Sequence, residues 1–183
     1  MQNTVLASVV GTVALLFASG CGPRWTVVKQ ADPNPMTASS KFMPEKVSLE
    51  GLRIGSKSEA QWVGTKEGET QEKWEGDKLA MNDEFQTGFE SARDGFGVPA
   101  GPEGAFKVRA HFTNYEPGFY VGVASGNAQI DATIDIVDPK GNVVDTFKVS
   151  AVAGGMAAGS RARSCANQIG ATAAKYVRKR VGL

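Results

Sequence analysis

The sequence has little of the side-chain chemistry that most catalytic and metal sites use. Its 183 residues include one histidine, His111, and two cysteines. Zinc sites draw several ligands from these two residue types, so no metal centre is expected. No serine stands in a Gly-x-Ser-x-Gly turn, and a Ser–His–Asp triad would have to recruit His111 from the middle of an expected strand. We therefore predict a protein that is not an enzyme and that has no catalytic, metal-binding or cofactor-binding residues.

Signs of phosphate or nucleic-acid binding are also missing. Residues 154–160 form a glycine-rich stretch before an expected helix, but they lack the Gly-Lys-Ser/Thr ending of a phosphate-binding loop. We interpret this stretch as a flexible connection. The chain has 20 lysines and arginines against 19 aspartates and glutamates, a net charge of +1. Because nucleic-acid-binding domains normally carry a clear basic surplus, we expect no nucleic-acid partner.

Long apolar runs are absent apart from one near the start. The uncharged segment 4–17 is shorter than the ~20 residues of a membrane-spanning helix and suits the apolar region of a signal peptide. It leads into Ala18-Ser19-Gly20-Cys21, which resembles the lipobox of bacterial prolipoproteins, in which the cysteine becomes the lipid-bearing N-terminus. Alanine at position 18, where leucine is most common, and the lack of Lys or Arg in residues 1–3 leave two alternatives. These are an ordinary secretory signal and an uncleaved anchor.

The lipobox interpretation divides the chain into three parts. Residues 1–20 are predicted to be a signal peptide, and residues 21–44 the lipidated N-terminus and a flexible tether rich in proline and small polar residues. Residues 45–183 are long enough for a single domain with its own core. Two or three acyl chains at Cys21 would attach the protein stably to a membrane. Gly22 replaces the aspartate that holds lipoproteins in the inner membrane, which favours the outer membrane with the domain facing the periplasm.

The spacing of apolar residues predicts the elements of this domain. Strict alternation indicates strands, and apolar residues three and four positions apart indicate helices. The expected order is strand 46–54, charged mobile insertion 55–76, helix 77–93, strands 106–112, 130–136 and 143–152, and helix 161–180. A hairpin turn is expected at 138–142. This order predicts an α+β two-layer sandwich, with a mainly antiparallel sheet and both helices on one face.

Two groups of residues are candidates for partner contact. The charged insertion contains Trp62 and Trp74, which a partner-binding loop would use. The last helix is basic, with six basic and no acidic residues from 160 to 183, while residues 55–95 hold ten acidic and five basic ones. Its final cations either complement the negative end of the helix or contact anionic headgroups or an acidic partner. This division of charge also favours self-association. The terminal candidates are Arg178, Lys179 and Arg180.

Three patterns together resemble a known group of proteins. They are Gly-Asn-Ala-x-Ile-x-Ala-x-Ile-x-Ile-x-Asp at 126–138, the Gly-Asn-Val-Val hairpin at 141–144 and the glycine-rich lead into an alanine-rich last helix. The chain is similar to small bacterial lipoproteins of a domain-of-unknown-function family, which combine a lipobox, a short tether and an α/β envelope domain. The resemblance implies fold and location, and it assigns no functional residues.

These observations predict a lipid-anchored envelope protein. Its partners would be the membrane, reached through Cys21, and other envelope components or a second copy of the chain, which its periplasmic domain binds or helps to assemble. A soluble exported ligand-binding domain is the first alternative. A periplasmic hydrolase, which would have to use His111, is the second.

Overall fold

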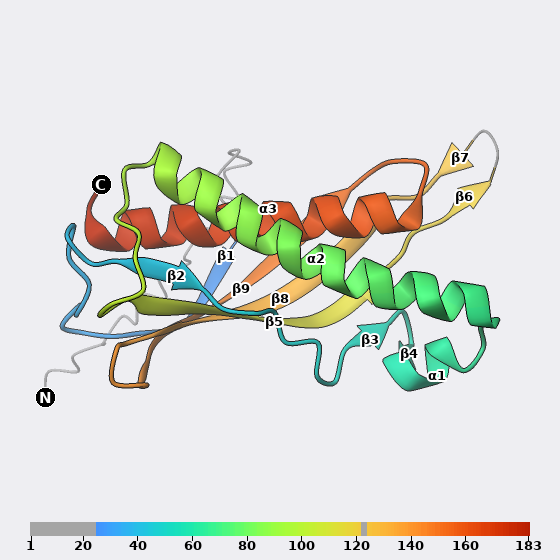
Figure 1. The fold of residues 1–183 in the computed structure, drawn as a ribbon, viewed down its shortest axis with the longest axis horizontal. Helices are drawn as coiled ribbons and strands as arrows, with labels where there is room; N and C mark the ends of the chain where they lie inside the picture. The colour runs from blue at the N-terminus through green and yellow to red at the C-terminus, as the bar shows by residue number, and fades with distance from the viewer. Residues whose placement is uncertain (1–24, 122–123) are drawn as a thin grey trace, which may run out of the picture.

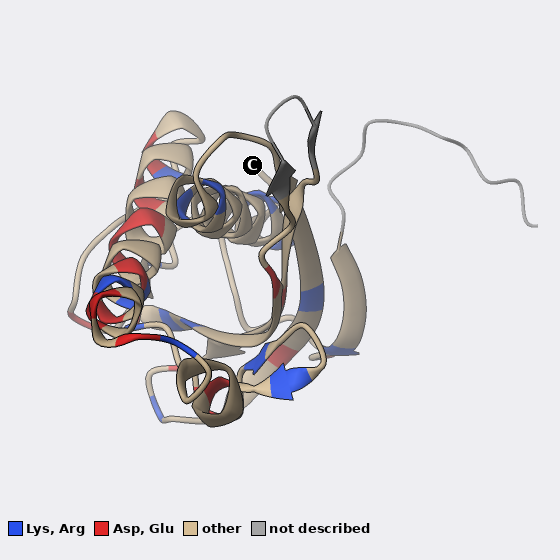
Figure 2. Ribbon diagram, turned by 90° about the vertical axis from the view of Figure 1, so that its right-hand side faces the viewer, with Lys and Arg blue, Asp and Glu red and all other residues tan. Residues whose placement is uncertain are grey.

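The computed structural model describes residues 25–121 and 124–183, which form a two-layer α+β sandwich (Figure 1). One layer is a mixed seven-stranded sheet in which the path of paired strands is β1-β9-β8-β5-β3-β4 and β2 also pairs with β5. The other layer consists of the long helices α2 (Gly68–Gly95) and α3 (Ala158–Val181), which cover one face of the sheet (Figures 1 and 2). This architecture confirms the predicted fold class.

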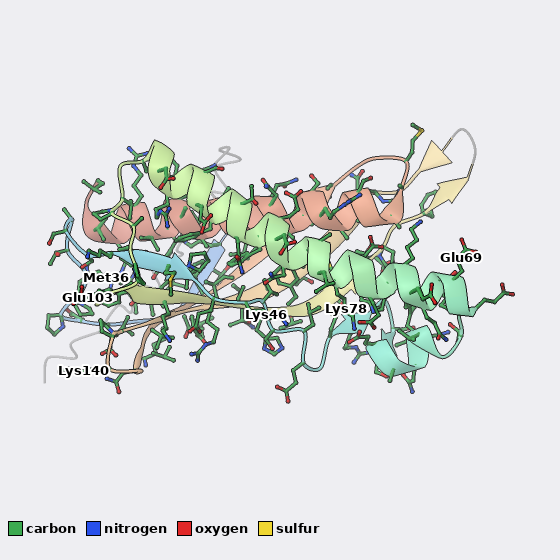
Figure 3. All side chains as sticks on the ribbon, in the orientation of Figure 1. Met36, Lys46, Glu69, Lys78, Glu103 and Lys140 are labelled. Atoms are coloured by element: carbon green, nitrogen blue, oxygen red, sulfur yellow. The ribbon has the colours of Figure 1, made fainter. Side chains whose placement is uncertain are left out.

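The centre of the sheet is the antiparallel meander of β5 (Phe106–Glu116), β8 (Ala128–Val137) and β9 (Val143–Ala153). Every second residue of these strands is apolar and points toward the helices, as predicted. Successive side chains of a strand point to opposite faces of the sheet, and here one face packs against the helices while the other faces solvent. The β8–β9 turn is held by the Asp138 carboxylate, which accepts the amides of Lys140 and Asn142 at 2.9 and 2.8 Å. Figure 3 labels Lys140 at this turn. The Asn142 side chain also donates to this carboxylate, at 3.0 Å, and its side-chain and main-chain hydrogen bonds together lower the pKa of Asp138.

Glycine allows the two long helices to approach closely. A Cβ atom at Gly88 in α2 would overlap the backbone of Asn167 in α3, and one at Gly170 in α3 would overlap the backbone around Phe85 in α2. The two glycines therefore set the distance between the helix axes. The predicted apolar stripe of α3 is buried below this contact and consists of Cys165, Ile169, Ala173, Tyr176 and Val177.

The prediction of a flexible tether over 21–44 is wrong for the part that the structure describes. Strand β1 (Trp25–Gln30) pairs antiparallel with β9, and β2 (Phe42–Pro44) pairs parallel with β5. Met36, between them, is 3% exposed. The proline-rich composition of 31–40 obscured these strands, although the run Trp-Thr-Val-Val at 25–28 favours a strand. The domain therefore includes Trp25 and does not begin at residue 45.

The predictions for 46–54 and 55–76 are also wrong. Only β3 (Arg53–Ile54) is a strand in the first segment, joined by a single bridge between Ser48 and His111. The second segment is not a loop, since it holds β4 (Lys57–Ser58), α1 (Glu59–Val63) and the start of α2. A capping box between Ser58 and Gln61 begins α1. The first turns of α2 bury little besides Trp74, so they lack the apolar stripe that reveals a helix.

Two short strands complete the described chain. β6 (Tyr120–Val121) and β7 (Ala124–Ser125) pair with each other in a separate two-stranded sheet beside the start of α3 (Figure 1). Of the helices in residues 25–121 and 124–183, none is both long enough and apolar enough to cross a membrane.

Candidate functional site

The predicted lipidation site, Cys21, and the predicted signal peptide 1–20 lie outside the described residues. The description begins at Trp25, four positions after Cys21. The indole of Trp25 packs edge-on against Tyr176 of α3, with ring centroids 5.7 Å apart. This contact brings the first described residue beside the basic end of α3.

Arg180 is held within the fold, which leaves little of its side chain for the partner contact predicted from the sequence. Its Nε lies 2.7 Å from Oδ2 of Asp145, and its guanidinium also donates to Oδ1 of Asp145 and to the carbonyl of Ala31. The Arg180 side chain is 14% exposed and that of Asp145 is 0% exposed. A buried ion pair of this kind holds α3, β9 and the end of β1 together.

Asp145 is the centre of this polar cluster, although it was not among the residues predicted from the sequence. Besides Arg180, its carboxylate accepts the Tyr176 hydroxyl at 2.8 Å and the Ala31 amide at 2.9 Å. The Tyr176 hydroxyl in turn accepts a hydrogen bond from the side-chain amide nitrogen of Gln30 at 3.1 Å. A signal was present, since Asp145 stands at an inward-facing position of the alternation that includes Phe147. A charged side chain at an inward-facing position of a strand needs a buried partner that pairs with its charge.

We expect the stability of the domain to fall as the pH rises above about 10. Burial, followed by the Asp145 carboxylate, raises the pKa of Tyr176 from 10.0 to about 12, and burial also raises that of Tyr115 to about 12. Between these values the folded chain keeps phenol protons that the unfolded chain has lost. The contribution of the two tyrosines to stability is therefore complete below pH 10 and declines up to about pH 12, by roughly 2 kcal/mol for each tyrosine.

Urea unfolding from about pH 8 to about pH 12 measures this decline. The Tyr176→Phe variant should lose part of the slope that the unsubstituted protein shows in the same window. Both proteins keep Cys165, whose raised pKa also makes stability fall as the pH rises. The difference between the two slopes therefore measures the contribution of Tyr176 alone. Identical slopes in the two proteins would show that Tyr176 does not titrate with the assigned shift.

Arg178 and Lys179, in contrast to Arg180, are exposed. The Arg178 guanidinium lies over the Phe96 ring at 4.8 Å, and its Nε donates to the main-chain oxygen of Leu183 at 2.9 Å. The Lys179 ammonium lies 5.9 Å from the centroid of a Trp25 ring. Together these groups border an open hollow of about 460 Å³ on the surface. We call it the basic hollow, and its lining residues are Trp25, Phe96, Lys175, Arg178, Lys179 and Leu183.

The two tryptophans of the predicted insertion do not form an exposed binding loop. Trp74 is 3% exposed, stacks on Tyr115 at 5.9 Å, and donates from Nε1 to Glu59 at 2.9 Å. Trp62 is half-buried and packs edge-on against Trp74. Lys78, labelled on α2 in Figure 3, also reaches Glu59, at 2.8 Å. These contacts fix α1 against α2 and β5, so the prediction of Trp74 as a partner contact is wrong.

The residues with nucleophilic or acid–base chemistry lie apart. The His111 Nε2 lies 2.6 Å from the main-chain oxygen of Glu50. Cys165 is fully buried in the α2–α3 layer, and this burial raises the pKa of its thiol to about 11, which disfavours the reactive thiolate. In the described part of the chain, no three His, Cys, Asp or Glu side chains stand close enough to hold a metal ion.

Solved structures share this fold only loosely. Two dodecamer structures of PelC from Paraburkholderia phytofirmans match 81% of this chain at 13% identity. One, of a point variant, is matched over 95% of its chain with a TM-score of 0.43, and the other over 96% with a TM-score of 0.42. At these values the likeness supports no inference about activity or assembly. No protein-family model and no curated protein matches the chain.

Proposed function

We propose that the protein is a bacterial envelope lipoprotein, anchored through Cys21 in the outer membrane, whose periplasmic domain binds or assembles other envelope components without catalysis. The observation that carries this proposal is the apolar run 4–17 followed by Ala18-Ser19-Gly20-Cys21. The position of the folded domain adds to it. Only residues 22–24 separate Cys21 from Trp25, a span of at most about 14 Å for an extended chain. An acyl group at Cys21 would therefore hold the domain at the membrane surface.

The state of the candidate reactive groups favours binding over catalysis. The buried Cys165 thiol is a poor nucleophile at neutral pH, because its pKa is raised to about 11. The ring of His111 is engaged with a main-chain oxygen on the face of the sheet away from the helices. The described surface carries exposed charged side chains and a few exposed large apolar ones, among them Leu79, Phe119 and Met156. Such a surface suits a contact with another envelope component or with a second copy of the chain.

Metabolic labelling tests the anchor directly. The full-length protein is expressed in a Gram-negative host with a palmitate analogue, beside Cys21→Ser and the matched variant Cys165→Ala. We expect label in the unsubstituted protein and in Cys165→Ala, and complete loss of label in Cys21→Ser. We also expect Cys21→Ser to leave the outer-membrane fraction. Label that persists in Cys21→Ser would overturn the proposal. A mature N-terminus away from Cys21, without acyl mass, would instead support a soluble exported domain.

A further inference from the structure

We propose that the basic hollow receives the phosphate headgroup of an anionic phospholipid from the same membrane that holds the acyl chains of Cys21. The domain would then have two contacts with the bilayer, one covalent and one through α3. This inference rests on the proposed lipid anchor, and it adds a binding site, its ligand and a fixed orientation of the domain on the membrane.

The charge of the basic hollow fits a phosphate ligand. Lys175, Arg178 and Lys179 are three and four positions apart, so they project from one face of α3. In the described residues, no ion pair joins Lys175 or Lys179 to an Asp or Glu side chain, and α3 itself contains no acidic residue. Arg178 donates from Nε to the main-chain oxygen of Leu183, the last residue of the sequence, so the two lysines are the cations with no such partner among the described residues. Near an anionic membrane surface, each such cation strengthens binding roughly five-fold. Three adjacent cations therefore make this the strongest candidate for membrane contact in the described surface.

The aromatic residues of the hollow suit the boundary between water and lipid. Trp25 is half-buried against Tyr176, while Phe96 lies beneath the Arg178 guanidinium. Tryptophan with neighbouring lysine and arginine is the combination that membrane proteins place at headgroup depth. The volume of about 460 Å³ lies within the range of small-molecule sites, which is sufficient for a glycerophosphate group. Leu183 of the hollow is 44% exposed, and Val27, which is 43% exposed, lines a neighbouring hollow together with Trp25 and Lys179.

The position of the hollow in the chain brings it to the membrane. The span from Cys21 to Trp25 is at most about 14 Å, and the headgroup layer on each side of a bilayer is about 5–8 Å thick. An acylated Cys21 would thus keep Trp25 within a short distance of the headgroups. The hollow lies around this residue, so no rearrangement of the described fold is needed for a headgroup to enter it.

The acidic side chains at the start of α2 lie far from the hollow, whereas Glu90 and Asp94 at its end stand near Phe96. Aspartate and glutamate are concentrated along α2 (Figure 2). The first turns of α2, where Figure 3 labels Glu69, are at the opposite end of the helical layer from the C-terminal end of α3 (Figures 1 and 3). An anionic membrane attracts the cations of the hollow and repels the acidic first turns of α2, which favours an orientation with the C-terminal end of α3 toward the bilayer.

The test uses acylated protein in vesicles and measures how fast an amine-reactive reagent modifies individual lysines. Vesicles of phosphatidylcholine alone are compared with vesicles that also contain phosphatidylglycerol. We expect modification of Lys175 and Lys179 to slow about five-fold in the anionic vesicles, and Lys140 at the β8–β9 turn to be unaffected. High salt should remove the protection, because it screens the headgroup charge. Equal rates in the two kinds of vesicle would overturn the proposal.

Two further arms identify the ligand and its site. The exposed pair Arg178→Gln/Lys179→Gln should abolish the protection of Lys175, whereas the remote substitution Lys140→Gln should leave it intact. Inorganic phosphate, added to protein in phosphatidylcholine vesicles, should not protect these lysines. Equal protection by free phosphate would show that the hollow binds a soluble anion and not specifically a lipid headgroup. That result would overturn the proposal.

Failure of the anchor can be told apart from failure of the headgroup site. If the purified protein lacks acyl mass, the proposed function fails, and the headgroup site is then tested by cosedimentation of that protein with phosphatidylglycerol vesicles. Loss of cosedimentation in Arg178→Gln/Lys179→Gln would support the site without the anchor. Acylated protein whose lysines stay unprotected would refute the site and leave the anchor standing.

Discussion

Gly170→Ala is expected to lower the free energy of unfolding by about 3 kcal/mol. A Cβ atom at this position would overlap the main chain of Phe85 and would lie 2.8 Å from the amide nitrogen of Phe89, both in α2. These are backbone atoms of a packed helix, so they cannot rotate away as a flexible side chain would. The helices must separate, and the apolar contacts on both sides of the crossing loosen. The better helix propensity of alanine, about 1 kcal/mol, offsets only part of this loss.

Urea unfolding of Gly170→Ala beside a matched glycine variant checks this expectation. Gly76 is also a helical glycine, but no atom lies within 4 Å of the position of its Cβ. Gly76→Ala should therefore be neutral or stabilise the protein by up to about 1 kcal/mol. Gly88→Ala, on the other side of the crossing, should behave like Gly170→Ala. A Gly170→Ala protein as stable as Gly76→Ala would show that the helices do not pack as closely as described.

Asp145→Ala is expected to destabilise the domain by about 3–5 kcal/mol, because it breaks a buried ion pair. The substitution leaves the Arg180 guanidinium, the Tyr176 hydroxyl and the Ala31 amide without their common acceptor. Each of these groups is largely removed from water, so water does not replace the lost bonds fully. The C-terminal end of β1 should also loosen, since the Ala31 amide follows directly after that strand.

Asp135→Ala is the matched control for this prediction. Asp135 lies on β8 and is half-buried, and it accepts a hydrogen bond from Thr146 at 2.6 Å. Its loss should cost about 1 kcal/mol. Thermal unfolding compares the two variants, and the double change Asp145→Leu/Arg180→Leu should recover much of the stability, since an apolar pair leaves no uncompensated charge. Equal Tm values for Asp145→Ala and Asp135→Ala would contradict a structural role for the buried pair.

The sequence predicts those helices and strands that bury one continuous face against the core. The alternation in β5, β8 and β9 and the apolar stripe of α3 arise because each element presents one face to a common core. The first turns of α2 have no such face, so their polar sequence resembled a loop. The short strands β1, β2 and β3 join the sheet through main-chain hydrogen bonds to β9 or β5. The pattern of their side chains therefore does not reveal that they are strands.

The residues of the candidate site also differ in whether the sequence alone predicts their exposure. The exposure of Arg178 and Lys179 follows from their place on the polar side of α3, which helical spacing reveals. The burial of Arg180 depends instead on Asp145, a residue 35 positions away on another element. Trp74 likewise stacks on Tyr115 of β5. Such pairings are set by tertiary neighbours, and a pattern within one segment does not contain them.

The pairing of β1 with β9 determines when the chain can finish folding. Trp25 lies opposite Val149, so the first strand waits for a partner that is made more than a hundred residues later. Closing a loop of this length costs about 4 kcal/mol in chain entropy. A growing or translocating chain can assemble β5 with β8 earlier, while β1 has no place to pair until β9 emerges. The N-terminal strand thus stays unpaired until the strand at the far edge of the meander has been made.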